Sequence, residues 1–192
     1  VWINGKQVGY SEDSATPAEF LITSFLKSHE NILDVKVFRW SDGSYLEDQD
    51  AWRRSGIYRN VYLFSTPEVH IRDFSVVTDL DDRYENAVLA VRAEVKHHNG
   101  HSAGNYRIRM ELFDRDLNPV CPAIERYVTQ LEAAGQGAGL ETAVQKPDLW
   151  SAEDPVLYHL ILKLIDPDGN ATEVESARIG FREVEIRNGQ LL

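Results

Sequence analysis

Cysteine is nearly missing from this chain, because Cys121 is the only one among its 192 residues. A single thiol cannot form an intrachain disulfide, so a hydrophobic core has to hold the fold together. Structural disulfides belong to oxidising compartments and are rare in the cytosol. The composition therefore favours a cytoplasmic location. The periplasm stays open as the alternative, because periplasmic proteins without disulfides also occur.

Long apolar runs and an excess of basic residues are missing as well. The longest apolar runs are too short for a transmembrane helix, and no basic-plus-apolar signal segment opens the chain. Acidic residues outnumber basic ones by 31 to 20, which gives a net charge of -11. Such a surface repels polyanions, so we expect neither nucleic acid nor a membrane as a partner.

The alternating pattern of β-strands is what the sequence has instead. With 43% hydrophobic and 10% aromatic residues, the chain is of a globular class. After Thr66-Pro67 apolar residues recur at every second position, as in Leu89 and Val91. Seven strands are predicted, over residues 69–78, 87–97, 105–114, 120–129, 138–145, 156–166 and 171–181. Seven short amphipathic strands favour an immunoglobulin-like sandwich, with a mobile loop over the glycine-rich residues 133–139.

Residues 1–66 have a different organisation. The pair Asn4-Gly5 predicts a hairpin across residues 1–10, since both residues tolerate positive φ. Three further elements are expected: a helical turn over residues 24–27 and strands over residues 31–40 and 57–64.

A polar, acid-rich segment, residues 41–61, is longer than an ordinary turn and leads into the last of these strands. Its acids are Asp42, Glu47, Asp48 and Asp50, and the tryptophans Trp40 and Trp52 stand beside them. Carboxylates accept several hydrogen bonds, and aromatic faces cover the apolar side of a sugar ring. The segment therefore suits a polyhydroxylated ligand.

Glu47 and Asp48 could be interpreted as a catalytic pair with Asp50, because retaining glycosidases place two carboxyls about 5–5.5 Å apart. Neighbours on an irregular loop seldom hold that geometry, so ion pairs with nearby arginines are the preferred interpretation. Trp40 and Trp52 could stack on a sugar, but packing in the core or at its rim is preferred.

Three histidines, His97-His98-x-x-His101, suggest a metal site. They have no cysteine or carboxylate companion nearby, and adjacent strand residues point to opposite faces. A solvated hairpin tip is the preferred interpretation.

A second metal pattern, Asp114-x-Asp116-x-Asn118 with Glu125 at the twelfth place, resembles the start of a calcium loop. Pro119 stands where that loop needs glycine for its sharp turn, and the flanking elements are strands. We therefore expect no calcium here.

A series of short blocks runs along the chain in a consistent order. They are Val1-Trp2-Ile3-Asn4-Gly5-Lys6, Thr16-Pro17-Ala18-Glu19-Phe20, Leu46-Glu47-Asp48-Gln49-Asp50, Pro147-Asp148-Leu149-Trp150-Ser151 and Gly180-Phe181-Arg182-Glu183-Val184. Their order and spacing resemble the large bacterial β-galactosidases of glycoside hydrolase family 2 over nearly all of the chain. Residues 79–145 agree in general pattern alone. One departure is Ala15, where similar chains carry arginine.

The resemblance implies an all-β fold: a partial jelly-roll (galactose-binding-like) segment followed by an immunoglobulin-like β-sandwich. Residues 1–66 would be the C-terminal half of a jelly-roll sugar-binding domain, and residues 67–182 the sandwich. Residues 183–192 would start the link to a TIM barrel that is absent from this internal fragment. Half a jelly roll leaves sheet edges and an apolar face open, so we expect the fragment to self-associate or to have a loosely ordered first segment.

The resemblance also implies a function. The parent would be a retaining bacterial β-galactosidase whose barrel supplies the acid/base, the nucleophile and the magnesium ligands. This chain would then hold no catalytic residue and be inactive alone. Asp50, six residues before Gly56, would accept hydrogen bonds from sugar hydroxyls and help to hold a sodium ion. Expected partners are a β-galactoside, the protein's own barrel and, as an option, further copies in a homo-oligomer.

Three alternatives stay open. The first is another family 2 glycosidase, such as a β-glucuronidase or β-mannosidase, although the string at residues 46–50 is similar to the galactosidase branch. The second is a non-catalytic carbohydrate-binding protein. The third is an adhesion-type interaction module.

Overall fold

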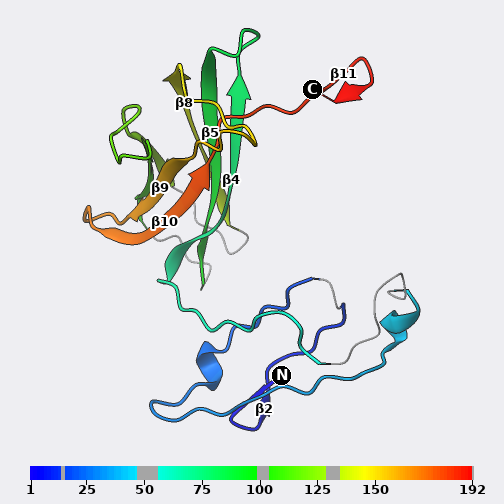
Figure 1. The fold of residues 1–192 in the computed structure, drawn as a ribbon. Coiled ribbons are helices and arrows are strands. Elements are labelled where there is room, and N and C mark those ends of the chain that lie inside the picture. Colours follow the sequence, from blue (N-terminus) through cyan, green and yellow to red (C-terminus); the bar gives the residue numbers. More distant parts are fainter. Residues whose placement is uncertain (14–15, 47–55, 99–103, 129–134, 192) are drawn as a thin grey trace. The chain divides into compact units, whose positions relative to one another are not determined.

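The computed structural model describes residues 1–13, 16–46, 56–98, 104–128 and 135–191. Almost all of their regular structure is β, and the helices described are single 3-10 turns. The chain divides into two compact units, Val1–Leu63 and Phe64–Leu192, which are described in turn (Figure 1). Among the described residues, no helix is long and apolar enough to cross a membrane. The all-β prediction is confirmed.

The second unit is a sandwich of two antiparallel sheets (Figure 1). Its strands are β4 (Val69–Leu80), β5 (Asn86–His97), β6 (Tyr106–Phe113), β7 (Ile124–Val128), β8 (Gln136–Gln145), β9 (Tyr158–Ile165) and β10 (Ala171–Ile179). One sheet has the order β4-β5-β8 and the other the order β10-β9-β6-β7. These strands are the ones predicted from alternation, and the immunoglobulin-like sandwich is confirmed.

The core lies between the two sheets, and one face of each strand packs into it. Leu89 and Val95 on β5 and Leu160, Leu162 and Leu164 on β9 have no exposed surface. Full burial of such a side chain stabilises the fold by about 1.5–3 kcal/mol. Because side chains alternate between the faces of a strand, the two-residue period in the sequence decides which of them reach the core.

The glycine-rich stretch was predicted to be a mobile loop, and this is wrong for the part that the structure describes. Residues 136–139 belong to β8, where Ala138 pairs with Ala93 of β5 and is buried. The long neighbouring strand β5 offers a hydrogen-bond partner at each step. Pairing therefore overrides the low strand propensity of Gly137 and Gly139.

At one side of the sandwich, edge strand β4 is joined to the C-terminal part of the chain by side chains. The carboxylate of Glu173 accepts a hydrogen bond from the backbone N–H of Ile71. The carboxylate of Glu183 accepts one from the backbone N–H of Leu80 at 3.3 Å. Edge strands carry unpaired N–H groups, so these contacts satisfy donors that the sheet leaves open.

The chain leaves the sandwich through a packed crossing. Phe181 is fully buried, meets Tyr158 edge-on at 5.0 Å, and accepts a hydrogen bond from the Trp150 N–H at 2.9 Å. The Arg182 guanidinium lies over the Trp150 ring, 4.9 Å from its centroid. A Cβ at Gly180 would approach that of Trp150 to 2.8 Å, so only glycine fits there.

Both ends of the described chain carry the same kind of hairpin turn. In the first, Asn4 and Gly5 have φ values of 53° and 77°, between β1 (Trp2–Ile3) and β2 (Lys6–Gln7). In the second, Asn188 and Gly189 have φ values of 52° and 77°, between β11 (Ile186–Arg187) and β12 (Gln190–Leu191). Positive φ at both central residues is the type I′ geometry that suits the twist of a hairpin.

Two longer strands predicted for the first unit are wrong in extent. Only β3 (Leu33–Asp34), which pairs with β1, is found within residues 31–40, and residues 57–64 contain no strand. The predicted helical turn is present as a 3-10 turn, η1 (Thr23–Phe25). Alternation produces a strand only where a neighbour offers hydrogen bonds, and β1 offers a partner for two residues.

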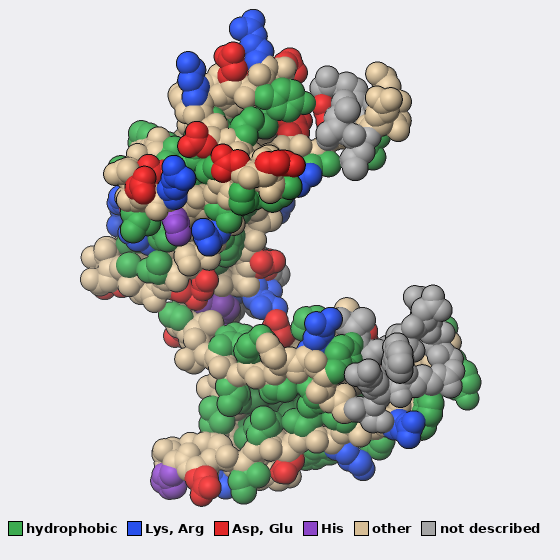
Figure 2. All heavy atoms as spheres, viewed as in Figure 1, with side chains coloured by type: hydrophobic (Ala, Val, Ile, Leu, Met, Phe, Trp, Pro, Cys, Tyr) green, Lys and Arg blue, Asp and Glu red, His purple; other side chains and the backbone are tan. Residues whose placement is uncertain are grey.

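The first unit exposes many large apolar side chains, and Figure 2 shows hydrophobic atoms gathered on it. The aliphatic residues Ile32, Val35, Val37, Ile57, Val61 and Leu63 are between 43% and 74% exposed. By contrast, Ile3 on β1 is 2% exposed. An open apolar face of this kind is what half of a jelly roll would leave. The self-association expected from it stays a prediction.

Candidate functional site

Asp50, the residue predicted to bind substrate and sodium, lies outside the described residues. The same holds for Glu47, Asp48 and Trp52. Their predicted roles, including the ion pairs with arginines, therefore stay predictions. Within the acid-rich segment the structure describes residues 41–46 and 56–61, on either side of residues 47–55.

The acid-rich segment begins with a hydrogen-bonded turn, η2 (Asp42–Tyr45). Ser41 caps it reciprocally: its side chain accepts from the Ser44 N–H, and the Ser44 hydroxyl accepts from the Ser41 N–H at 2.9 Å. The Leu46 N–H then donates to the Gly43 carbonyl at 2.9 Å. The acid-rich segment thus begins from a capped turn whose own polar groups are satisfied.

On both sides of residues 47–55 in the chain, an exposed aromatic ring lies beside a cationic side chain. The Arg39 guanidinium lies 5.4 Å from the Trp40 ring, and that of Arg59 lies 5.6 Å from the Tyr58 ring. Trp40 is 56% exposed, so it is not buried in the core, while packing at the rim and stacking on a sugar both stay predictions. A half-exposed ring next to hydrogen-bond donors can stack on the apolar face of a sugar.

The histidine and aspartate patterns are not metal sites among the residues that the structure describes, where no group of three or more His, Cys, Asp or Glu could hold a metal ion. His101 lies outside those residues. The prediction of a solvated hairpin tip is wrong for His97, which is 8% exposed and lies 3.7 Å from a carboxylate oxygen of Glu68. His97 continues the two-residue period of the buried residues of β5, such as Val95, so the alternation in the sequence already placed this side chain on the core face.

The predicted absence of a calcium loop at Asp114 agrees with how its carboxylate is used. One oxygen accepts from the backbone N–H groups of Asp116 and Asn118, both at 2.9 Å, and the other from the Asn118 side chain at 3.1 Å. These bonds hold the pKa of Asp114 below its usual value, with the Asn118 N–H as the main cause. A carboxylate occupied by its own turn is not free to bind calcium.

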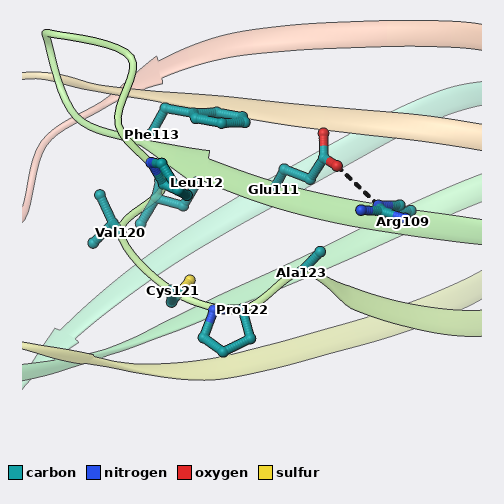
Figure 3. A pocket seen from close by; sticks show the side chains of 9 residues that line it. Arg109, Glu111, Leu112, Phe113, Val120, Cys121, Pro122 and Ala123 are labelled. Carbon is teal, nitrogen blue, oxygen red and sulfur yellow. Dashed lines mark hydrogen bonds and ion pairs between the residues drawn. The ribbon is translucent and has the colours of Figure 1, made fainter.

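A hollow of about 550 Å³ opens on the sandwich where β6 runs past the end of β7 (Figure 3). Its lining combines charged and apolar side chains: Arg109, Glu111, Leu112, Phe113, Pro119, Val120, Cys121, Pro122 and Ala123. Arg109 donates from Nε to Glu111 at 2.8 Å, as the dashed line shows. Burial raises the pKa of the Cys121 thiol, so the thiolate is disfavoured and a nucleophilic role is not supported.

The charges beside this hollow neutralise one another. Glu111 accepts from Lys163 at 2.6 Å, which is the main cause of its lowered pKa. Glu125 accepts from Arg107 and Arg109, both at 3.2 Å. An ion-paired group of this kind ties β6, β7 and β9 together and leaves little net charge for a ligand. We therefore assign it to the stability of the sheet.

Sequence reasoning missed this group because its members are far apart in the chain. Arg109 faces Lys163 across β6 and β9 and faces Glu125 across β6 and β7. The available signal was the alternation of charged residues with buried ones along β6. Without the strand register, that signal places the charges on the outer face but does not pair them.

Comparisons with known proteins agree with this architecture from end to end. Residues 1–67 match the sugar binding domain of glycosyl hydrolases family 2, and residues 69–182 match the model described as glycosyl hydrolases family 2. A β-galactosidase of Priestia megaterium is 49% identical over 190 residues, which cover 98% of this chain and 18% of the relative. A β-galactosidase of Vibrio cholerae is 42% identical over 196 residues, which cover 100% of this chain and 19% of the relative. The chain thus spans about a fifth of the length of these relatives.

Solved structures of family 2 enzymes have a similar fold. A β-glucuronidase of Bacteroides uniformis superposes with a TM-score of 0.83 at 25% identity, over 96% of this chain and 23% of that one. A family 2 glycosyl hydrolase of Bacteroides cellulosilyticus superposes with a TM-score of 0.81 at 23% identity, over 96% of this chain and 25% of that one. At these identities the likeness shows the fold.

Proposed function

Because the chain belongs to glycoside hydrolase family 2, we propose that it forms non-catalytic β domains of a β-galactosidase that hydrolyses terminal β-D-galactosides with retention. The observation that carries this proposal is the match to curated β-galactosidases over the whole chain. It includes the acid-rich segment as well as the sandwich core. A match limited to core residues would support the fold and say less about the substrate.

Asp50 is the residue through which we propose that this chain contacts the substrate. A carboxylate accepts hydrogen bonds from two sugar hydroxyls at once and is a hard oxygen ligand for sodium. A single carboxylate does not complete the coordination of a cation, so Asp50 would contribute one ligand among others, which we propose that the barrel supplies. The magnesium of the intact enzyme would likewise be held elsewhere.

The sandwich has the features of a rigid spacer in this proposal. Its core is fully buried, the carboxylates of Asp114 and Asp166 are bound within their own turns, and charged side chains of β6, β7 and β9 form ion pairs. Retaining hydrolysis needs two carboxyls on opposite sides of a sugar, one as acid/base and one as nucleophile. Glu111 and Glu125 are each bound to two cationic side chains, which leaves neither suited to that role. We therefore propose that the chain has no hydrolytic activity by itself, in line with catalysis in a barrel domain.

A β-glucuronidase is the second candidate, because the fold superposes well on that of Bacteroides uniformis. The whole-chain identity to curated β-galactosidases is higher, and this favours the galactosidase. The two differ in the substrate, since a glucuronide carries a carboxylate that a galactoside lacks. Rates on matched nitrophenyl galactoside and nitrophenyl glucuronide separate them, and a preference for the glucuronide would overturn the proposal.

The role of Asp50 is tested by Asp50→Asn in the longer enzyme that carries this chain. We expect kcat/KM on a nitrophenyl β-galactoside to fall by about 100-fold, because a charge-assisted hydrogen bond in the site is lost. The dependence of the rate on sodium should weaken at the same time. Asp48→Asn is the matched control, since it removes a charge from the same segment, and it should stay within about threefold of the native enzyme. Equal effects of the two substitutions would remove Asp50 from the site.

A further inference from the structure

Two histidines stack on one another at the end of the sandwich where β4 begins and β5 ends. His70 is the second residue of β4, and His98 directly follows β5. Their ring centroids are 4.4 Å apart and the ring planes differ by 27°. His70 is 6% exposed, and its Nδ1 is buried without a hydrogen-bond partner among the described residues. A buried ring nitrogen with no partner is unusual and calls for a physical reason.

His98 joins this pair to the segment that precedes β4. Its Nε2 lies 2.9 Å from the Thr66 hydroxyl oxygen, and its backbone N–H donates to the Glu68 carbonyl at 3.0 Å. His98 thus binds residues 66–68 to the sandwich, and its ring is stacked on that of His70. Residues 66–68 are also the residues through which the chain passes from the first unit into β4.

The surroundings of the pair oppose added positive charge. The charges of Arg72 on β4 and Lys96 on β5 oppose a proton on His70, and a hydrogen bond to the Glu68 backbone is the one contribution that favours it. His97, on the core side of β5, lies 3.7 Å from the same Glu68. Burial, followed by the neighbouring His98, lowers the pKa of His70. A proton on the buried ring would therefore be a poorly solvated charge beside a second imidazole and two cations.

We propose that His70 and His98 form an acid-sensitive clasp, which fastens residues 66–68 to the sandwich at neutral pH and releases them as the pH falls from about 7 to about 5. The sign follows from the neutral ring of His70. Its contribution to folding is complete above the unfolded pKa of about 6.5 and is lost as the pH falls through its lower folded value. Release would free the residues that precede β4 within the second unit, and this holds whichever sugar the parent enzyme hydrolyses.

A metal site is the other use to which clustered histidines are put, and the geometry speaks against it. Two rings stacked face to face direct their nitrogens past one another, whereas ligands of one ion converge on a point. No group in the described chain has the arrangement of a metal site. The stacked pair is therefore better suited to sense protons.

The test is amide hydrogen exchange of the 192-residue chain at pH 7.5 and pH 5.5, corrected for the intrinsic pH dependence of exchange. The His98 N–H, which donates to Glu68, is the reporter. The Trp150 N–H, which donates to Phe181, is the internal reference. We expect the protection of His98 to fall by about tenfold or more at pH 5.5 while that of Trp150 is unchanged. An unchanged protection of His98 would overturn the clasp.

Two variants make the assignment specific. His70→Phe keeps a flat ring in an apolar site and removes the titrating group, so the pH response should vanish. His29→Gln removes an exposed histidine of the first unit and should leave the response intact. A pH response that survives in His70→Phe would contradict the proposal. If His70→Phe also loses protection at Trp150, the variant His98→Phe, at the exposed position, tests the clasp instead. A pH response that survives in His98→Phe would equally contradict the proposal.

Discussion

At the scale of single residues, two turns of the sandwich are built from the same four bonds. In Asp114–Asn118 and in Asp166–Asn170, the aspartate N–H donates to the asparagine carbonyl, and the aspartate carbonyl accepts from the N–H of the fourth residue. The aspartate carboxylate accepts from the asparagine N–H and from the asparagine side chain. In each turn the fourth residue has positive φ. It is Leu117 at 63° in the first and Gly169 at 91° in the second. The left-handed region is easy for glycine and costly for leucine.

This pair predicts substitutions of opposite sign. Leu117→Gly should raise the free energy of unfolding by about 0.5 kcal/mol, since relief of the left-handed backbone exceeds the added entropy of the unfolded chain. Leu117 is 65% exposed, so little burial is lost. Gly169→Leu should lower the free energy of unfolding by about 1–2 kcal/mol. A Cβ at Gly169 meets its nearest atom at 3.9 Å, so a clash does not confuse the result.

Urea unfolding of the three chains measures both effects. The Gly169→Leu variant is the matched control for Leu117→Gly, because the hydrogen bonds of the two turns are the same. Destabilisation by both substitutions would show that side-chain contacts, and not the backbone, decide these positions.

At the scale of elements, neighbouring strands are joined by charges as well as by backbone ladders. Glu111 is 14% exposed at its side chain and holds both Arg109 and Lys163, which face each other across β6 and β9. Glu111→Gln leaves these two cations opposed without their acid. We expect a loss of about 1 kcal/mol, the scale of ion pairs that are partly open to solvent.

A double-mutant cycle with Lys163→Met isolates the pair, with the free energy of unfolding as the measurement. The coupling between Glu111 and Lys163 should shrink as salt is added, because screening weakens exposed charges. A coupling near zero at low salt would mean that the backbone ladder alone joins β6 to β9.

Edge strand β4 depends on a carboxylate from β10. Glu173 accepts from the Ile71 N–H, and burial raises the pKa of Glu173 above its usual value. A raised pKa means that this group contributes stability below its unfolded pKa, and that the contribution is lost as the pH rises through the folded value. We therefore expect stability to decline from about pH 4.3 upwards, and Glu173→Gln to remove that decline while keeping an acceptor oxygen.

Glu173→Ala separates the charge from the hydrogen bond. It leaves the Ile71 N–H, on a residue that is 7% exposed, without its acceptor, which costs about 1–3 kcal/mol at every pH. Thermal unfolding followed from pH 4 to pH 7 distinguishes the two variants. Parallel pH profiles for the native chain and Glu173→Gln would show that the carboxylate does not titrate as inferred.

The elements also show where prediction from the sequence succeeds. In the sandwich each strand has at least one long antiparallel neighbour, and alternation located β4 to β10 closely. In the first unit the same alternation over residues 31–40 produced two paired residues, and residues 57–64 produced none. The alternating pattern indicates that a segment is able to form a strand, whereas the presence of a partner strand decides whether the strand forms.

At the scale of the whole molecule, the exposed apolar residues of the first unit predict self-association of the isolated chain. Val35 and Val37 are 43% and 49% exposed, on the apolar side of the alternating segment. Light scattering after size exclusion should show a mass that rises with concentration, because burial of such a surface is favourable. A well-folded monomer at all concentrations would contradict this.

Lysine substitutions locate the surface responsible. Val35→Lys together with Val37→Lys should reduce the association, since charge opposes burial of the face. Val77→Lys is the control, because Val77 is 58% exposed on β4 of the second unit and lies outside the predicted face. If Val77→Lys reduced the association equally, the reduction would come from a general increase in solubility and not from the predicted face.

Composition and alternation by themselves determined that this chain is an all-β protein with an immunoglobulin-like sandwich, because a period of two residues is local and can be read without a partner. The short sequence blocks pointed to the family in the same way, through their residues and their spacing. Three contacts were decided by the tertiary structure alone: the hydrogen bond from Ile71 to Glu173, the ion pair of Glu111 with Lys163, and the stacking of His70 on His98. These contacts join residues 28 to 102 positions apart, and only strand register, which is set by the packing of the whole sheet, brings them together.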